Sequence, residues 1–163
     1  MELKTILEKR RSVRKFLDRK VEQEKLQRIA DMALTAPSSR NSRSTRLMIV
    51  DKKEDLEHIS TMRDYGAAFV KNAAAAILVM GDKEKSDLWL DNCAITATIL
   101  QMAVVDEGLA SCWVHVGDYL TLKDEPESQR SEDYVKEVLP EIPAEYRILC
   151  VISIGYADYT PKP

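Results

Sequence analysis

Glycine is scarce in this sequence, and the few glycines are scattered. Only five of the 163 residues are glycine, at positions 66, 81, 108, 117 and 155. They form neither the GxGxxG fingerprint of dinucleotide-binding domains nor a P-loop. A phosphate ligand would therefore have to be held by side chains instead of a glycine-rich backbone, and a tightly held dinucleotide in a Rossmann site is disfavoured.

Cysteine and histidine are also rare. The three cysteines, Cys93, Cys112 and Cys150, are far apart in the sequence, and there are only two histidines. No Cys/His set has the spacing of a metal site, and no Ser/His/Asp or Cys/His nucleophilic set can be assembled. We therefore expect no metal and free thiols in a reducing cytoplasm. If the protein is an enzyme, a cofactor should carry the reaction.

Long hydrophobic runs and a strong net charge are absent as well. No run reaches the length of a membrane span, and the first residues are charged and amphipathic, unlike a signal peptide. A net charge of −3 argues against general binding to nucleic acid or to a membrane surface. The length and the 45% of apolar residues fit one domain, residues 1–163, with a substantial core.

Hydrophobic periodicity predicts interleaved helices and strands. This order indicates an α+β fold (α/β in the broad sense), with a mixed central sheet and helices on both faces. Helices are expected over residues 3–10, 22–34, 53–62, 86–107 and 132–139, and strands over 47–50, 73–80, 110–116 and 147–154.

The expected helix over residues 86–107 is apolar on more than one side. Such a helix must be covered on several sides, so it should be a central core helix, a subunit interface, or both. If it lies at a twofold axis, the residues that pack across this axis are expected to be Trp89, Ile95, Ile99 and Met102.

Four cations and a hydroxyl are crowded into residues 10–16, Arg-Arg-Ser-Val-Arg-Lys-Phe. In an extended conformation side chains alternate between faces, so Arg10, Ser12 and Arg14 would point one way. Two guanidinium groups with a hydroxyl between them fit a phosphate. A solvated basic turn after a helix is the alternative interpretation, and it is favoured for such a run taken alone.

A polar loop without glycine covers residues 36–44. Its hydroxyl and amide groups could bind the edge of a heteroaromatic ring or a ribityl chain. An ordinary capping turn is the alternative, because Ser and Asn are favoured there in any case. His115, on the strand expected over residues 110–116, is either a structural histidine or a site residue.

Taken together and in this order, several segments resemble the nitroreductase family of FMN-dependent flavoproteins. The resemblance covers nearly the whole chain, and it implies an α+β fold and an intertwined homodimer with two FMN molecules at the interface. The segments that carry it are residues 10–16, residues 36–42, Asp91 in the long helix, residues 108–113 and residues 154–156.

The resemblance also assigns the residues that would bind FMN. Arg10, Ser12 and Arg14 would hold the phosphate and the ribityl chain, with Arg11 nearby. The loop of the other subunit would contact the flavin ring through Pro37, Ser38, Ser39 and Asn41. The strand would lie along the same ring with Cys112, Trp113, Val114 and His115.

One departure from the family pattern concerns this ring. Arg43, Ser44 and Thr45 stand where the family commonly has Gln-Pro-Trp. Arg43 would then lie near the pyrimidine end, where a positive charge or a backbone N–H would stabilise the anionic reduced flavin. The polar loop over residues 117–131 has no family pattern and is expected to be a lid that sets specificity.

These assignments predict an FMN-dependent oxidoreductase that takes hydride from NADH or NADPH. The hydride would pass through flavin N5 to a nitroaromatic, quinone or enone-type small-molecule acceptor, and no catalytic side chain is assigned because the flavin carries the chemistry. Another flavin reaction on the same fold (reductive dehalogenation, azoline oxidation or flavin fragmentation) is a second hypothesis. Binding of nucleic acid by the basic run from Lys9 to Lys20 is a third.

Overall fold

Nine helices and strands follow one another in the computed structural model, which describes residues 1–162. All the elements expected from periodicity are present, with ends shifted by a few residues, and two short 3-10 helices are added. The elements are α1 (Leu3–Lys9), α2 (Gln23–Ala33), η1 (Ser39–Asn41), β1 (Thr45–Val50), α3 (Lys53–Ser60), η2 (Ala68–Asn72), β2 (Ala75–Asp82), α4 (Trp89–Asp106), β3 (Ala110–His115), α5 (Ser131–Val138) and β4 (Tyr146–Gly155).

The four strands form one sheet in the order β1-β2-β4-β3, and each neighbouring pair is antiparallel. β4 is central and lies opposite β2 and β3, with Val151 facing Leu78 on one side and Val114 on the other. A parallel pairing occurs in an isolated bridge between Ser12 and Ser111. The expected α+β class is therefore confirmed, but the four-stranded sheet is antiparallel throughout and not mixed, because the parallel bridge lies outside its strands.

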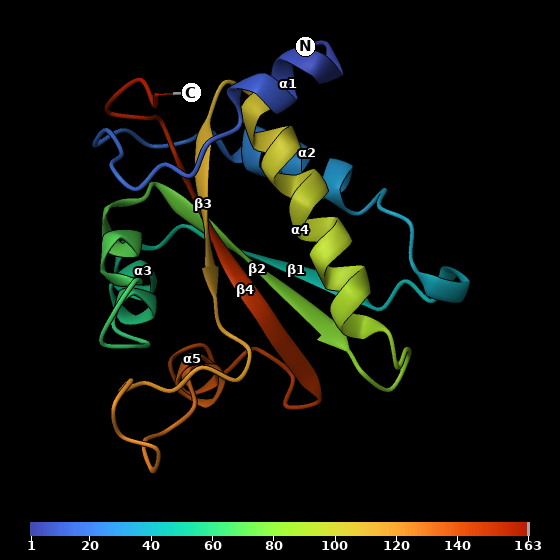
Figure 1. Cartoon of the computed structure of the whole chain (residues 1–163), viewed down its shortest axis with the longest axis vertical. Helices are drawn as coiled ribbons and strands as arrows, with labels where there is room; N and C mark the ends of the chain where they lie inside the picture. Colours follow the sequence, from blue (N-terminus) through green and yellow to red (C-terminus); the bar gives the residue numbers. More distant parts are fainter. Residues whose placement is uncertain (163) are drawn as a thin grey trace.

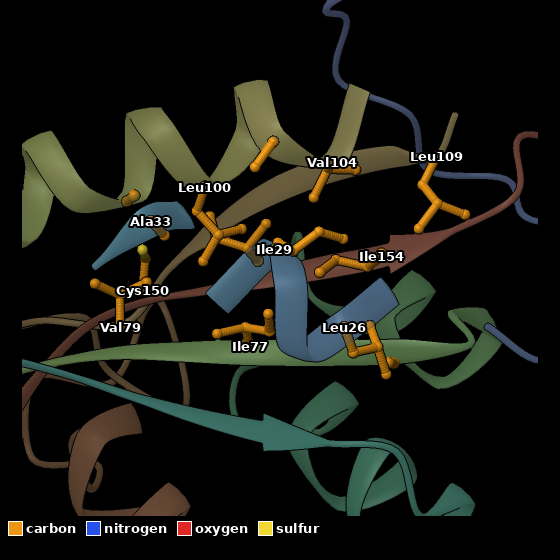
Figure 2. Packing of buried hydrophobic residues seen from close by; sticks show 14 of the residues in the cluster. Leu26, Ile29, Ala33, Ile77, Val79, Leu100, Val104, Leu109, Cys150 and Ile154 are labelled. Carbon is orange, nitrogen blue, oxygen red and sulfur yellow. The ribbon is translucent and has the colours of Figure 1, made fainter. Parts of the chain in front are cut away.

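Helices cover both faces of the sheet, as expected (Figure 1). On one face, α2 and α4 pack against inward-facing residues of β2 and β4, and Figure 2 shows Ile29 and Leu100 in one cluster with Ile77 and Ile154. On the other face, α3 and α5 form a second core with the opposite side chains of the same strands. Burial on both faces explains why β2 and β4 are apolar almost throughout.

Helix α4 is the longest element, with 18 residues, which corresponds to about 27 Å. Leu100 and Val104 are completely buried against the sheet, whereas Ile95 is 42% exposed on the outer side. Trp89 differs from the expectation, because its ring packs against the sheet: a Cβ at Gly81 would lie 2.5 Å from that ring. Ile95, and not Trp89, is thus on the outer face of α4.

Cys93, Cys112 and Cys150 are free thiols and all three are buried. Within residues 1–162, no helix combines the length and the apolar content that crossing a membrane requires, and no three His, Cys, Asp or Glu side chains are grouped closely enough to hold a metal ion.

Candidate functional site

Residues 10–16 run in an extended conformation across the start of β3. The N–H of Val13 donates a hydrogen bond to the carbonyl of Ser111 (2.9 Å), which lies beside Ser12 in the parallel bridge. Val13 and Phe16 are buried and pack with Ala73. Because the apolar residues face inward, the side chains of Ser12 and Arg14 are left exposed.

The three arginines of this segment differ in their surroundings. Arg11 donates to the carbonyls of Glu8 (2.9 Å) and Arg10 (2.7 Å), so its charge is used within the chain. Among residues 1–162, the guanidinium groups of Arg10 and Arg14 take part in no ion pair or hydrogen bond; that of Arg14 lies 5.9 Å from the centroid of the Phe69 ring. Two guanidinium groups are therefore available to an anion.

β3 brings Cys112 to this segment. Burial raises the pKa of the Cys112 thiol, while the positive charge of Arg14 and a hydrogen bond with Ser12 act in the opposite direction. The pKa of Cys112 thus responds to both Ser12 and Arg14, which places the three residues near one another. The thiol stays protonated at neutral pH and acts as a small apolar surface.

The strand residues assigned to one ring lie on two faces of the sheet. Val114 packs into the core with α3 and α5, whereas Trp113 packs against the core with α2 and α4. Successive side chains of a strand point to opposite faces, so Trp113 cannot present its side chain to a ligand that contacts Cys112 and Val114. A ligand along the strand would meet Trp113 through its main chain.

His115 ends β3 in a cluster that the sequence did not reveal. Its ring meets Tyr119 edge-on with centroids 5.1 Å apart, and the guanidinium of Arg63 lies 4.9 Å from the Tyr119 ring and 5.0 Å from the Tyr65 ring. Burial and then the charge of Arg63 lower the pKa of His115, and Asp118 opposes them. His115 is therefore neutral at pH 7, and no spacing in the sequence marks its partners.

The loop over residues 117–131 is tied to the body of the protein. The N–H of Asp64 donates to the carbonyl of Thr121 (2.8 Å), and the Ser131 hydroxyl donates to the carbonyl of Met62 (3.0 Å). Gly117 has φ +36°, and a Cβ there would lie 2.8 Å from Nε2 of His115. The loop expected to act as a lid is thus held beside His115 by main-chain contacts.

Asn92 organises the serine-rich loop before β1. Its Oδ1 accepts a hydrogen bond from the N–H of Ser39 (2.9 Å), and its Nδ2 donates to the hydroxyls of Ser44 (3.0 Å), Ser39 and Ser42 (both 3.3 Å). Asn92 is only 2% exposed. The family resemblance seen in the sequence used the neighbouring Asp91, which is exposed, and did not reveal that Asn92 holds the loop.

The tip of this loop is also connected within the chain. The Arg43 N–H donates to the Ser38 hydroxyl (3.0 Å), and Arg43 Nε donates to Asn41 Oδ1 (2.9 Å). Arg40, Asn41 and Arg43 have positive φ values of 51°, 54° and 50°. Pro37, Asn41 and Arg43 are exposed. The network holds the tip in a conformation that non-glycine residues seldom adopt.

One chain does not bring the two predicted halves of the site together. The serine-rich loop is attached to Asn92 near the start of α4, whereas the N-terminal ammonium group pairs with Asp106 at its other end (2.6 Å). Asn92 and Asp106 are roughly 20 Å apart along the helix axis. Figure 1 shows residues 10–16 and η1 on opposite sides of the molecule.

Comparison with known proteins gives consistent results. The model of the family described as "Nitroreductase family" matches residues 7–62 and 53–156. A protein of Methanothermobacter thermautotrophicus, provisionally named NADH dehydrogenase/NAD(P)H nitroreductase, is 31% identical over 164 residues, which cover 99% of this chain and 80% of the relative. A protein of Archaeoglobus fulgidus with the same provisional name is 30% identical over 90% of this chain and 80% of its own length.

The fold also resembles that of a solved structure. An FMN-dependent nitroreductase from Clostridium difficile R20291 superposes with a TM-score of 0.89 and 40% identity, over 96% of this chain and 88% of its own.

Proposed function

The chain belongs to the nitroreductase family, and on that premise we propose that it is an FMN-dependent oxidoreductase. We infer that NADH or NADPH is the donor, and that nitroaromatics, quinones or enones are the acceptors. Bound FMN would supply the redox chemistry, namely hydride transfer at N5. The three free, buried thiols agree with a reducing compartment such as the cytoplasm.

One observation supports this proposal more than any other. Arg10 and Arg14 have no acceptors within residues 1–162, although the protein carries a net charge of −3. Charge-assisted hydrogen bonds from guanidinium groups suit a phosphate. The residues present therefore fit FMN, whose phosphate would meet Arg10 and Arg14 and whose ribityl chain would meet Ser12.

The chain's own residues would bind and orient the ligand. The bridge between Ser12 and Ser111 and the buried side chains of Val13 and Phe16 fix the segment before any ligand arrives. A preorganised segment loses little conformational entropy on binding. Cys112, with its raised pKa, would stay neutral and add no negative charge beside the phosphate.

We further propose that the active form is a homodimer. The two halves of the site lie near opposite ends of α4, where Asn92 and Asp106 are roughly 20 Å apart along the axis, so a second copy would supply the serine-rich loop with Ser39, Asn41 and Arg43. Apolar side chains are exposed on α1 and α4, among them Leu3 (63%), Leu90 (50%) and Ile95 (42%). Burying these side chains between two copies would stabilise such an assembly.

The test begins with the purified protein. It should be yellow, release FMN on denaturation, and be bleached by NADH or NADPH without oxygen. Light scattering should give the mass of a dimer. A colourless protein that binds no added FMN would refute the proposal, and a monomer that holds flavin tightly would refute the shared site.

An acceptor panel then separates the flavin reactions. Steady consumption of NAD(P)H with a quinone or a nitroaromatic compound supports the proposed function. Turnover restricted to a haloaromatic or an azoline substrate would instead assign the chain to another reaction on this fold.

A further inference from the structure

A second basic region lies next to the proposed FMN-binding segment. It is a cleft of about 570 Å³ between residues 14–20, the start of α3 and the residues that lead into β2. Its floor is partly apolar, with Phe16, Leu56 and Ala73 among the lining residues. Six cations line it: Arg14, Lys15, Arg19, Lys20, Lys53 and Lys71.

The charge of this cleft is only partly compensated, and Arg19 is the lining cation that forms an ion pair, with Glu22 (3.9 Å). Only three carboxylates line it, Asp18, Asp51 and Asp158, so the lining carries a net charge of +3 in a protein of net charge −3. Within residues 1–162, none of its four lysines forms an ion pair. Such a surface is built to attract an anion with several charges.

The position of the cleft relates it to the proposed function. Arg14 lines the cleft and also lies beside Ser12 and Cys112, so the two regions share a residue. From Arg14, the lining continues along the chain to Lys20, through a turn in which the Arg19 N–H donates to the Leu17 carbonyl (2.8 Å). The volume suits one nucleotide-sized group and is too small for a whole dinucleotide together with a flavin.

We propose that this cleft binds the phosphorylated adenosine end of the nicotinamide donor and makes the protein prefer NADPH to NADH. The proposal rests on the proposed function, because it needs a donor whose nicotinamide end reaches the flavin beyond Arg14. The 2′-phosphate adds a dianion that NADH lacks, and exposed lysines attract it as point charges. The apolar floor would cover one face of the adenosine.

The binding test uses adenosine 2′,5′-bisphosphate and adenosine 5′-monophosphate as probes of the FMN-loaded protein. Calorimetry should show the bisphosphate binding about tenfold more tightly, as expected for one added charge-assisted contact, and less tightly at high salt. The Lys20→Ala/Lys53→Ala double variant should lose that difference. The matched control, Lys83→Ala, changes an exposed lysine in the turn after β2, outside the cleft. Equal affinity for both probes would overturn the proposal.

Steady-state kinetics complete the test. The KM for NADPH should rise about tenfold in the double variant and stay unchanged in Lys83→Ala. An unchanged KM for NADPH in the double variant would overturn the proposal, whereas the proposed function would stand. If the bisphosphate binds as expected but neither nucleotide reduces the flavin, the proposed function fails and the anion site remains.

Discussion

In residues 10–16 the main chain is held and the side chains of Arg10 and Arg14 are left without partners, whereas in residues 38–44 the polar side chains themselves hold the loop. Val13 and Phe16 anchor the first segment through burial, and the guanidinium groups of Arg10 and Arg14 remain available. In the second segment, Asn92 and Arg43 occupy most of the hydroxyl and amide groups.

This difference indicates that residues 10–16 can bind a ligand, whereas the side chains of residues 38–44 stabilise their own loop. A side chain without a partner can give its full interaction to a ligand, since no internal bond must be broken first. A loop held by its own side chains offers a ligand mainly its shape and the groups left at its tip. We therefore expect changes in the first segment to weaken ligand binding, and changes in the second to destabilise the fold.

The largest effect should come from removing both free arginines. The Arg10→Ala/Arg14→Ala variant should bind FMN more than about 100-fold more weakly, because each lost charge-assisted hydrogen bond costs about 1.5–3 kcal/mol. Fluorescence titration of the apoprotein with FMN measures this, and chemical unfolding should show little change. Arg11→Ala is the matched control, because that guanidinium is bound to main-chain carbonyls. Unchanged FMN affinity in the double variant would contradict the comparison.

The Asn92→Ala variant tests the second region, the loop over residues 38–44. It leaves the Ser39 N–H and the buried Ser44 hydroxyl without partners, so the free energy of unfolding should fall by about 3 kcal/mol. Urea unfolding measures the loss. Thr98→Ala, at an exposed position of the same helix, should change stability by less than about 0.5 kcal/mol. A stable Asn92→Ala protein would show that the network is not the support of the loop.

The two regions also differ in the cysteine beside them. Burial raises the pKa of Cys93, which accepts a hydrogen bond from Thr45 after the serine-rich loop, to about 11. The thiol of the unfolded chain loses its proton nearer pH 9.0. Between these values the folded state binds more protons, so stability falls as pH rises, by about 2–3 kcal/mol in total.

Unfolding experiments at a series of alkaline pH values measure this slope. Cys93→Ala should reduce it, and part of the slope should remain because burial also raises the pKa of Cys150. Cys112→Ala should flatten it less, because Arg14 and Ser12 oppose the effect of burial on the pKa of Cys112. Equal slopes in wild type and Cys93→Ala would count against a buried, protonated Cys93.

The smallest effect concerns backbone strain at the tip of the serine-rich loop. Arg40 is exposed and has φ 51°, so Arg40→Gly should raise the free energy of unfolding by at most about 1 kcal/mol. Lys15→Gly, in the extended segment, should lower it by a similar amount, because glycine gains entropy only in the unfolded chain. Thermal unfolding measures whether each variant gains or loses stability. A change of the same sign in both variants would contradict the assignment of backbone strain to Arg40.

Much of the fold could be predicted from the sequence, because local periodicity decides it. The apolar positions of α2 recur with a helical period, and the continuous apolar runs of β2 and β4 predict strands buried on both faces. The role of Trp89 could not be predicted in this way. Helical periodicity places its side chain on a face of α4, but only the approach of Gly81 in β2 shows that this face lies against the sheet.

For the site, the sequence by itself determined the kinds of groups: three arginines and a serine in a short extended run, a loop of serines and an asparagine, and no glycine cradle. Tertiary structure alone decided which of them are free. It tied Arg11 to carbonyls, assigned Asn92 to the serines, placed Arg63 between two tyrosines and separated the two segments along α4. The physical reason is that hydrogen bonds and charge compensation depend on contacts between residues far apart in the chain, which no local pattern of residues records.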